Sequence, residues 1–403
     1  MKKSMYGLGM MLALAAPAAE AINQEIRALF TPDPAQPQRN VFINKTPNSG
    51  YCATYPGQCE QNNMFSIQLP IQFGPSQPIE AGTPVSIKAP ANWRQLTVIN
   101  KDTGETETVE VRITGIGSRH YYSDPVTTLT GESDVLSGHR KLWSGSSWVN
   151  ASPPCQYSGV GAYSPITYLF FWKTPVEASC TKLLAFRIPH MYFNTIDFAY
   201  ELRTPNPLGM SSGLYTGSMN YSIGPGLDFD MGGINSNDDS LTLDFVLDVQ
   251  HTLKVDIPPG GNKVILEPQG GWQSWLDQGR KPVRLMRDQT FLISASSRFT
   301  MRLECEFDQV EGCAITDRQS GYTGVVNVSV SLPHGLMNSS GQPVKRMLLG
   351  RMASAPFQPG IYVDRKPGTL HFEVSERDTN WLIINAQDRP FKGNITVIWD
   401  SEV

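Results

Sequence analysis

Residues 240–257 read SLTLDFVLDVQHTLKVDI, and in this run apolar side chains alternate with polar ones almost without a break. The apolar positions are Leu241, Leu243, Phe245, Leu247 and Val249, and after His251 they continue at Leu253, Val255 and Ile257. A period of two puts these side chains on one face of a β-strand, and that face needs a second apolar layer. The run therefore predicts strands of a β-sandwich.

The same alternation recurs between clusters of Gly, Pro, Asn and Asp. It is found in residues 301–307, 326–332 and 395–399, and residues 96–98 and 109–113 flank a hairpin-like turn at 101–104. The sequence contains no convincing amphipathic helix of three or more turns. The expected fold class is all-β, with two β-sandwich domains.

A stretch rich in turn-forming residues, 224–239, suggests where the two domains meet. The residues before it are rich in aromatic side chains and long polar loops, whereas residues 240–403 alternate more regularly. We therefore expect an N-terminal domain over residues 22–223, a linker over 224–239 and a second domain over 240–403.

The first 21 residues resemble a signal peptide. Lys2 and Lys3 precede an apolar run, and the small-x-small sequence Ala19-Glu20-Ala21 predicts cleavage before Ile22. The protein is then exported through the periplasm. The formal charge is −4, or −5 without the signal peptide, and no basic cluster indicates binding to nucleic acid.

Six cysteines follow the signal peptide, and an oxidising periplasm favours disulfides. Fifteen pairings are possible, and we favour the local ones because short loops close at low entropic cost. These are Cys52–Cys59, Cys155–Cys180 and Cys305–Cys313.

No motif of a catalytic or nucleotide-binding site is present, so we expect neither an enzyme nor a cofactor. The six histidines are isolated in sequence, and no metal site is predicted from them. Metal binding by histidines distant in sequence, such as His120, His139 and His190, stays open at this point.

Several stretches carry a family resemblance. They are Gly270-Gly271-Trp272-Gln273-Ser274-Trp275, residues 291–299 leading to Cys305 and Cys313, residues 393–401, and the opening segment from Phe42 to Cys52. With them the chain resembles chaperone-usher fimbrial adhesins and minor fimbrial subunits, whose second domain is pilin-like.

The resemblance implies that the second domain is an incomplete immunoglobulin-like sandwich with a groove where one strand is missing. Its edge would be formed by Ile395, Val397 and Trp399. The partners implied are a periplasmic pilus chaperone, the outer-membrane usher and the adjacent pilus subunit, and the place is a cell-surface fimbrium. The chain departs from the pilin pattern in having Glu402 next to last and its glycine at Gly393.

Receptor binding would belong to the first domain. Flat apolar rings and planar polar groups in loops suit sugar recognition, and two segments offer them, with Trp143 and Trp148 in one and Arg119, His120 and Tyr121 in the other. By contrast, Tyr192 and Phe193 are expected in a buried strand. Trp272 and Trp275 are expected to cap a core edge.

We therefore expect a fimbrial tip adhesin that attaches bacteria to a surface or to a glycan or protein receptor. The alternative is a structural adaptor or minor pilus subunit without receptor binding. Residues 22–30 discriminate between them, because an adaptor needs a free N-terminal donor strand and a tip subunit does not. Their sequence pattern fits either role.

Overall fold

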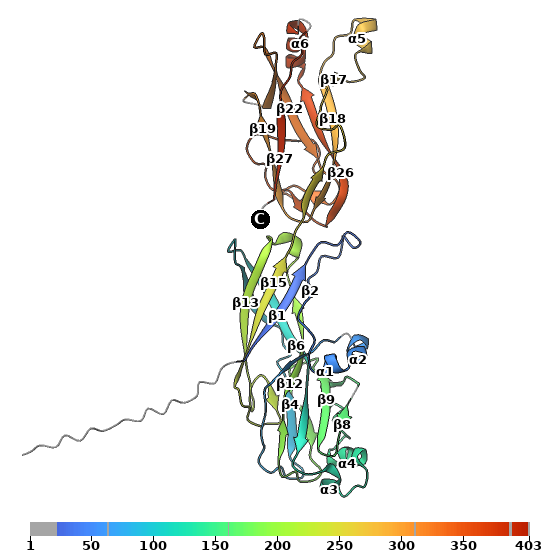
Figure 1. Cartoon of the computed structure of the whole chain (residues 1–403), viewed down its shortest axis with the longest axis vertical. Coiled ribbons are helices and arrows are strands. Elements are labelled where there is room, and N and C mark those ends of the chain that lie inside the picture. Colours follow the sequence, from blue (N-terminus) through green and yellow to red (C-terminus); the bar gives the residue numbers. More distant parts are fainter. Residues whose placement is uncertain (1–21, 63, 160, 310–311, 387–388, 402–403) are drawn as a thin grey trace, which may run out of the picture.

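The computed structural model describes residues 22–62, 64–159, 161–309, 312–386 and 389–401. The expected signal peptide and Glu402 lie outside these residues. The described chain forms two β-domains placed end to end, with the last strand running back toward their junction (Figure 1). Its longest helix has ten residues, so the prediction of an all-β protein is confirmed. No helix in this part of the chain is long and apolar enough to cross a membrane.

The described part of the first domain is built on a sheet of twelve strands. These are β1 (Ile22–Phe30), β2 (Ile43–Asn44), β3 (Ile67–Leu69), β5 (Arg94–Asn100), β6 (Thr106–Tyr122), β7 (Gln156–Tyr157), β8 (Ala162–Tyr163), β9 (Thr167–Lys173), β11 (Met191–Phe193), β12 (Ile196–Arg203), β13 (Gly213–Ser222) and β15 (Ser240–Val249). A smaller sheet contains β4 (Pro84–Lys88), β10 (Cys180–Leu183) and β14 (Asp230–Met231). Both sheets contribute to one apolar core.

Short helices decorate this domain. They are α1 (Tyr51–Thr54), α2 (Pro56–Gln61), α3 (Val126–Thr130), α4 (Val135–Leu142) and a 3₁₀ turn at Pro207–Gly209. The predicted hairpin joins β5 to β6, with Leu96 opposite Val109. Gly104 closes its turn with a φ of 73°, a conformation that suits glycine.

The expected domain boundary is wrong. Residues 224–239 are woven into the first domain, where Asp230 pairs with Lys88 and Asn237 donates its backbone N–H to the Gln72 carbonyl. Phe229 and Met231 are fully buried there. Turn-forming residues mark reversals inside a domain as well as linkers between domains, and here they mark reversals.

The alternating run that predicts the sandwich is therefore shared between the two domains. Its first half, β15, lies in the first domain with all five apolar side chains buried, and its second half is β16 (Leu253–Asp256) of the second domain. Only Gln250, His251 and Thr252 connect them. The second domain thus begins near residue 252 rather than at 240.

The second domain is a sandwich of one large and one small sheet. Its larger sheet, with eight strands in the described chain, contains β16, β17 (Glu267–Pro268), β18 (Leu285–Ala295), β20 (Asp308–Gln309), β21 (Gly312–Thr316), β22 (Thr323–Ser331), β24 (Met347–Leu348) and β26 (Val363–Val374). The smaller sheet is the pair β19 (Phe299–Cys305) and β27 (Ile395–Ser401). A further pair is β23 (Leu336–Met337) and β25 (Gln358–Pro359), and the helices are α5 (Gln273–Gln278) and α6 (Glu376–Asn385).

Polar contacts join the two domains. The His251 ring reaches the Ser296 hydroxyl at 3.1 Å and the Met210 carbonyl at 2.9 Å, and so links the second domain to the first. Arg298 forms an ion pair with Glu105, at 3.7 Å. The two domains are therefore held together by side-chain contacts as well as by the connecting residues.

All three expected disulfides are confirmed: Cys52–Cys59, Cys155–Cys180 and Cys305–Cys313. The first closes the α1–α2 segment against the outer face of the large sheet, where Tyr51 stacks on Phe171. The other two lie within one domain each.

Candidate functional site

The last strand of the second domain has one unpaired edge. β27 pairs with β19 from Ile395 opposite Cys305 to Ser401 opposite Phe299, and no other strand in the described residues pairs with it. In an antiparallel pair the hydrogen-bonded positions alternate. The Glu306 N–H donates to the Asn394 carbonyl, so the backbone groups of Ile395, Val397 and Trp399 point to the unpaired edge.

An apolar groove of about 480 Å³ runs beside this edge. One wall is β27, with the half-buried Ile395, Val397 and Trp399. The opposite wall comes from the larger sheet, and its apolar members are Phe291, Ile315, Val326, Leu370 and Phe372. The predicted groove beside the strand ending at Trp399 is therefore present in the described structure.

The groove has the features of a missing-strand site. The apolar side chains that line it belong to the core of the domain, yet those on β27 are partly exposed to solvent. The Trp399 Nε1–H is buried and has no hydrogen-bond partner in the described chain. Unpaired backbone groups next to apolar surface are costly and invite pairing with another chain.

Gly393 lies just before β27, where the chain passes close to β21. Lys392, one residue earlier, still exchanges two backbone hydrogen bonds with Thr316 of β21, at 2.9 and 3.1 Å. A Cβ on Gly393 would lie 2.6 Å from the Ala314 carbonyl oxygen. A glycine is thus needed where the chain passes the backbone of β21.

The N-terminal strand is built into the first domain. β1 pairs in parallel with β15 over its whole length, from Ile22 opposite Leu241 to Phe30 opposite Val249, and its other edge pairs with β2 at Ala28 and Leu29. Ile26 and Phe30 are buried in the core. The segment that could have served as a free donor arm is therefore occupied within its own domain.

Three of the expected receptor residues are buried and do not form a surface. Trp143 is 2% exposed, and Trp148 and His120 are fully buried. Trp148 stacks on Trp172, with centroids 5.0 Å apart, and the His120 Nε2 lies 2.7 Å from the Tyr122 hydroxyl. The Ser- and Gly-rich loop from Trp143 to Trp148 turns both indole rings inward, where large aromatic rings supply much of the core's apolar area. His120 lies on the inward face of β6.

Burial also governs the charge state of the two histidines in this core. Desolvation holds the pKa of His120 well below its usual value, and the nearby His139 and Arg119 add to this effect. Burial lowers the pKa of His139 in the same direction. Both rings are thus neutral core groups. Among the described residues, no three His, Cys, Asp or Glu side chains form a metal-binding group.

Arg119 and Tyr121 lie on the other face of β6, where they are half-exposed. The Tyr121 ring stacks on Tyr192, with centroids 4.8 Å apart and an interplanar angle of 3°. Asn194 Nδ2 donates to the Tyr121 hydroxyl at 3.4 Å, and Arg119 Nη1 donates to the Thr167 hydroxyl at 3.4 Å. These residues, Arg119, Tyr121, Tyr192 and Asn194, form what we call the tyrosine surface.

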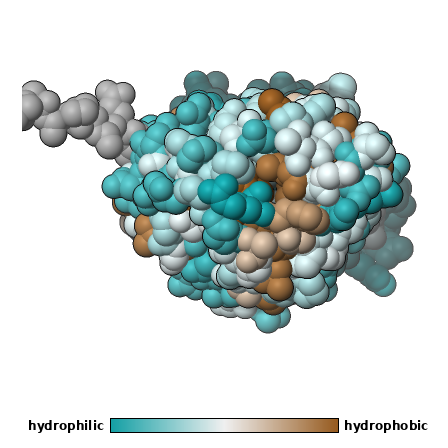
Figure 2. Space-filling view, turned by 90° about the horizontal axis from the view of Figure 1, so that it is seen from below, coloured by the Kyte–Doolittle hydropathy of each residue, from teal (hydrophilic) through white to brown (hydrophobic). Residues whose placement is uncertain are grey.

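The tyrosine surface lies near the end of the molecule that is farthest from the second domain. β6 begins close to the junction and ends at Tyr122, just before α3 (Figure 1). Viewed from that end, the molecule presents an apolar strip bordered by hydrophilic residues (Figure 2). Tyr192 is 39% exposed, so its expected place in a buried strand is wrong.

Sequence reasoning missed the opposite wall of the groove and the tyrosine surface. The alternation in β18 and β26 identifies inward-facing residues but not that Phe291, Leu370 and Phe372 lie against an unfilled space. Tyr192 and Arg119 are 73 residues apart, and their proximity follows from the pairing of β6 with β11. Only the pairing of distant strands could have revealed either set.

No family model and no curated protein matches this chain. Solved structures that it matches include a chaperone–tip adhesin complex of CFA/I fimbriae (10% identity, TM-score 0.25, covering 95% of this chain and 97% of that one) and CfaE, the adhesive subunit of the CFA/I fimbria of enterotoxigenic Escherichia coli (10%, 0.25, 95% and 94%). Another is the CsuC–CsuE chaperone–tip adhesion subunit complex of Acinetobacter baumannii (8%, 0.22, 94% and 98%).

Proposed function

We propose that this chain is the tip adhesin of a fibre assembled by the chaperone-usher pathway. The observation that carries the proposal is the apolar groove beside the unpaired edge of β27. A strand added there would pair with the free backbone groups of Ile395, Val397 and Trp399 and bury the side chains that line the groove. A periplasmic chaperone would supply that strand first, and the adjacent pilus subunit would replace it at the usher.

The position of β1 favours a tip subunit over an adaptor. An adaptor fills the groove of a neighbouring subunit with its own N-terminal strand, but here Ile22–Phe30 pairs with β15 and β2 of its own domain. Releasing β1 would expose Ile26 and Phe30, leave β2 without a partner and leave β15 paired on one edge only, with β13. The chain thus has a groove to receive a strand and no free strand to give from this segment.

Receptor contact is assigned in this proposal to the tyrosine surface. Aromatic faces cover the C–H face of a sugar ring, and an arginine and an asparagine offer donors for hydroxyl or acidic groups. Arg119 and Tyr121 keep the role proposed for them from sequence, and Tyr192 and Asn194 join them. Trp143, Trp148 and His120 support this surface only through the core beneath it.

The test is strand complementation of the full mature chain. A synthetic peptide of nine residues with alternating apolar side chains should bind the refolded chain and raise its thermal unfolding temperature. A peptide of the same composition without the alternation should do neither, because only one face of a strand meets the groove. The proposal is wrong if the chain is a monomer that binds neither peptide and has the same unfolding temperature with and without them.

A further inference from the structure

The groove continues beyond the point where β27 begins. A second cavity of about 710 Å³ adjoins the groove, and we call it the extension. Residues that line both cavities include Val264, Leu266 and Ile315. The extension reaches as far as Trp272, Trp275 and Phe391. Just before β27, the backbone groups of Lys392 already pair with Thr316 and are not free for an added strand. A chain lying in this extension would contact the apolar side chains that line it.

The rim of the extension carries unmatched positive charge. Its lining includes Lys263, Lys392, Arg318 and Glu306, and Arg318 forms an ion pair with Glu306. Lys263 and Lys392 are exposed, and neither forms an ion pair with a residue in the described part of the chain. This rim thus carries two cations without an acidic partner among the described residues.

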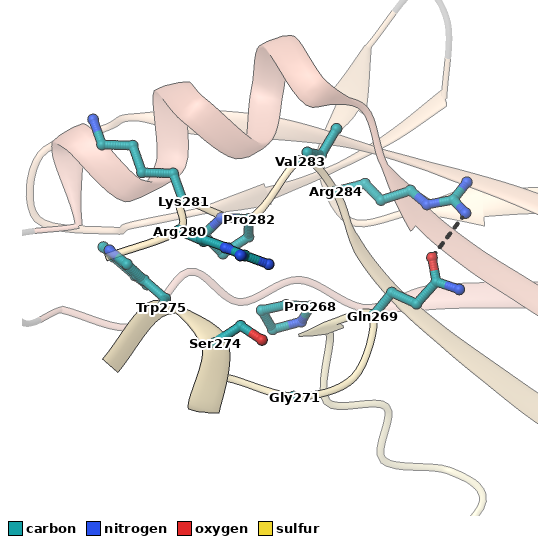
Figure 3. A pocket seen from close by; sticks show the side chains of 10 residues that line it. All are labelled: Pro268, Gln269, Gly271, Ser274, Trp275, Arg280, Lys281, Pro282, Val283 and Arg284. Carbon is teal, nitrogen blue, oxygen red and sulfur yellow. Dashed lines mark hydrogen bonds between the residues drawn. The ribbon is translucent and has the colours of Figure 1, made fainter. Parts of the chain in front are cut away.

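A basic pocket adjoins the extension at Trp275, which lines both. In Figure 3 the Arg280 side chain reaches into this pocket, whereas Lys281 points away from it. Arg284 hydrogen bonds Gln269 and forms an ion pair with Glu373, both at 3.2 Å. Arg280 has no such carboxylate partner in the described chain, and no acidic residue lines the pocket.

The groove itself, between Phe291 and Val397, has no charged residue in its lining. The positive charge is therefore gathered at one end, past Ile395. An added strand that runs antiparallel to β27 starts opposite Ser401 and leaves the groove past Ile395, and antiparallel pairing is the more stable kind per residue. The segment that follows such a strand on its C-terminal side would then cross the basic end.

We propose that the strand filling this groove is followed, on its C-terminal side, by an acidic segment of the adjoining subunit. Its carboxylates lie over Lys263, Lys392 and Arg280, and an apolar side chain enters the extension beside Trp272 and Trp275. This inference rests on the proposed function and adds to it a partner chemistry and a direction. Apolar burial supplies most of the affinity, and charge selects the orientation and the partner.

The test is a competition measured on the full mature chain that holds a fluorescent peptide with an alternating apolar core and neutral ends. Three unlabelled peptides share this core and carry three acidic residues at the C-terminal end, three at the N-terminal end, or serines at both ends. The C-terminally acidic peptide should compete about tenfold better than the neutral one at low salt, and the advantage should fall to about twofold in 0.5 M salt. The N-terminally acidic peptide should show no advantage.

A second experiment removes the positive charges at this end of the groove. The triple substitution Lys263→Gln, Lys392→Gln, Arg280→Gln should abolish the advantage of the C-terminally acidic peptide and leave neutral-peptide binding within about twofold. The control is Lys345→Gln, an exposed lysine that lines neither the groove nor its extension. If the neutral peptide binds but the C-terminal acidic residues give no advantage, the inference is overturned and the proposed function stands. If no peptide binds, the proposed function itself fails.

Discussion

The ring of Trp399 lies edge to face against the ring of Phe291, with centroids 5.6 Å apart. This contact joins the last strand to the opposite sheet, beside the unpaired edge and two residues beyond Val397. β27 is thus held by its pairing with β19 and by this aromatic contact, while the middle of its groove-facing side stays open. A substitution at Val397 can therefore change the groove without releasing the strand.

Val397→Asp is expected to abolish capture of a donor strand. Filling the groove would bury the new carboxylate among apolar side chains, which costs several kcal/mol when the charge has no partner. We expect the affinity for an alternating peptide to fall by at least about 100-fold, which corresponds to about 2.7 kcal/mol. Fluorescence titration of the full chain measures this.

Leu348→Asp is the matched control, because Leu348 is 61% exposed and lies away from the groove. Its affinity for the peptide should stay within about twofold of the unsubstituted chain. Equal losses in both variants would mean that the effect is general destabilisation and not blockage of the groove.

Substitutions in the first domain should separate stability from adhesion. Trp143→Ala removes a buried ring that donates to the Tyr122 hydroxyl at 3.0 Å, and we expect a loss of roughly 3–5 kcal/mol in the free energy of unfolding. Tyr121→Ala removes a half-exposed stacked ring and should cost only about 1 kcal/mol. Denaturant unfolding measures both.

Adhesion should depend on Tyr121, although this ring contributes little to stability. Bacteria whose fibres carry the Tyr121→Ala chain should lose attachment, while their fibres assemble in normal amounts. Normal attachment by this variant, together with a stable fold, would remove the tyrosine surface from the receptor site.

His120 should make the first domain less stable in mild acid. Its pKa is held well below its usual value in the folded state, so the unfolded chain binds more protons below about pH 6.5. The stability due to the neutral ring is therefore complete above that pH and is lost as the pH falls from about 6.5 toward the folded pKa. Asp197 acts in the opposite direction, because burial raises its pKa to about 6 and the folded state then takes up a proton first.

A comparison with His120→Gln isolates the histidine, because both chains keep Asp197. The difference in unfolding free energy between the two chains should shift in favour of the Gln variant between pH 7.5 and pH 5. Chemical denaturation at the two pH values measures this shift. Identical pH profiles would show that His120 stays neutral in both states or titrates equally in both.

The sequence predicts well whatever depends on period and local spacing. Alternation at Leu241, Val328 and Val397 identified the strands and their inward faces, and the short spacing from Cys305 to Cys313 favoured the correct disulfide. Prediction from the sequence failed where the domain assignment depends on which distant strands pair. Ser240–Val249 belongs to the first domain because its neighbours are β1 and β13, and nothing within the strand itself specifies them.

The receptor residues show the same limit in another form. Trp148 and Tyr192 both stand in segments with aromatic and polar neighbours, yet one is fully buried and the other is 39% exposed. The difference arises because Trp148 faces Trp172 and Phe170 in the core, while Tyr192 faces outward on the opposite side of the sheet. Composition indicates that a ring is present but not which side of the sheet it occupies.

The most direct measurement of the central claim is amide hydrogen exchange within β27, followed residue by residue. The amides of Thr396, Ile398 and Asp400 face β19 and should be protected in the chain alone, so they serve as internal controls. The amides of Ile395, Val397 and Trp399 face the unpaired edge and should exchange fast. They should slow by about tenfold or more once an alternating peptide or a chaperone strand occupies the groove. If these three amides are already as protected as their neighbours in the chain alone, the edge is not open and the account of a strand-accepting fibre subunit is contradicted.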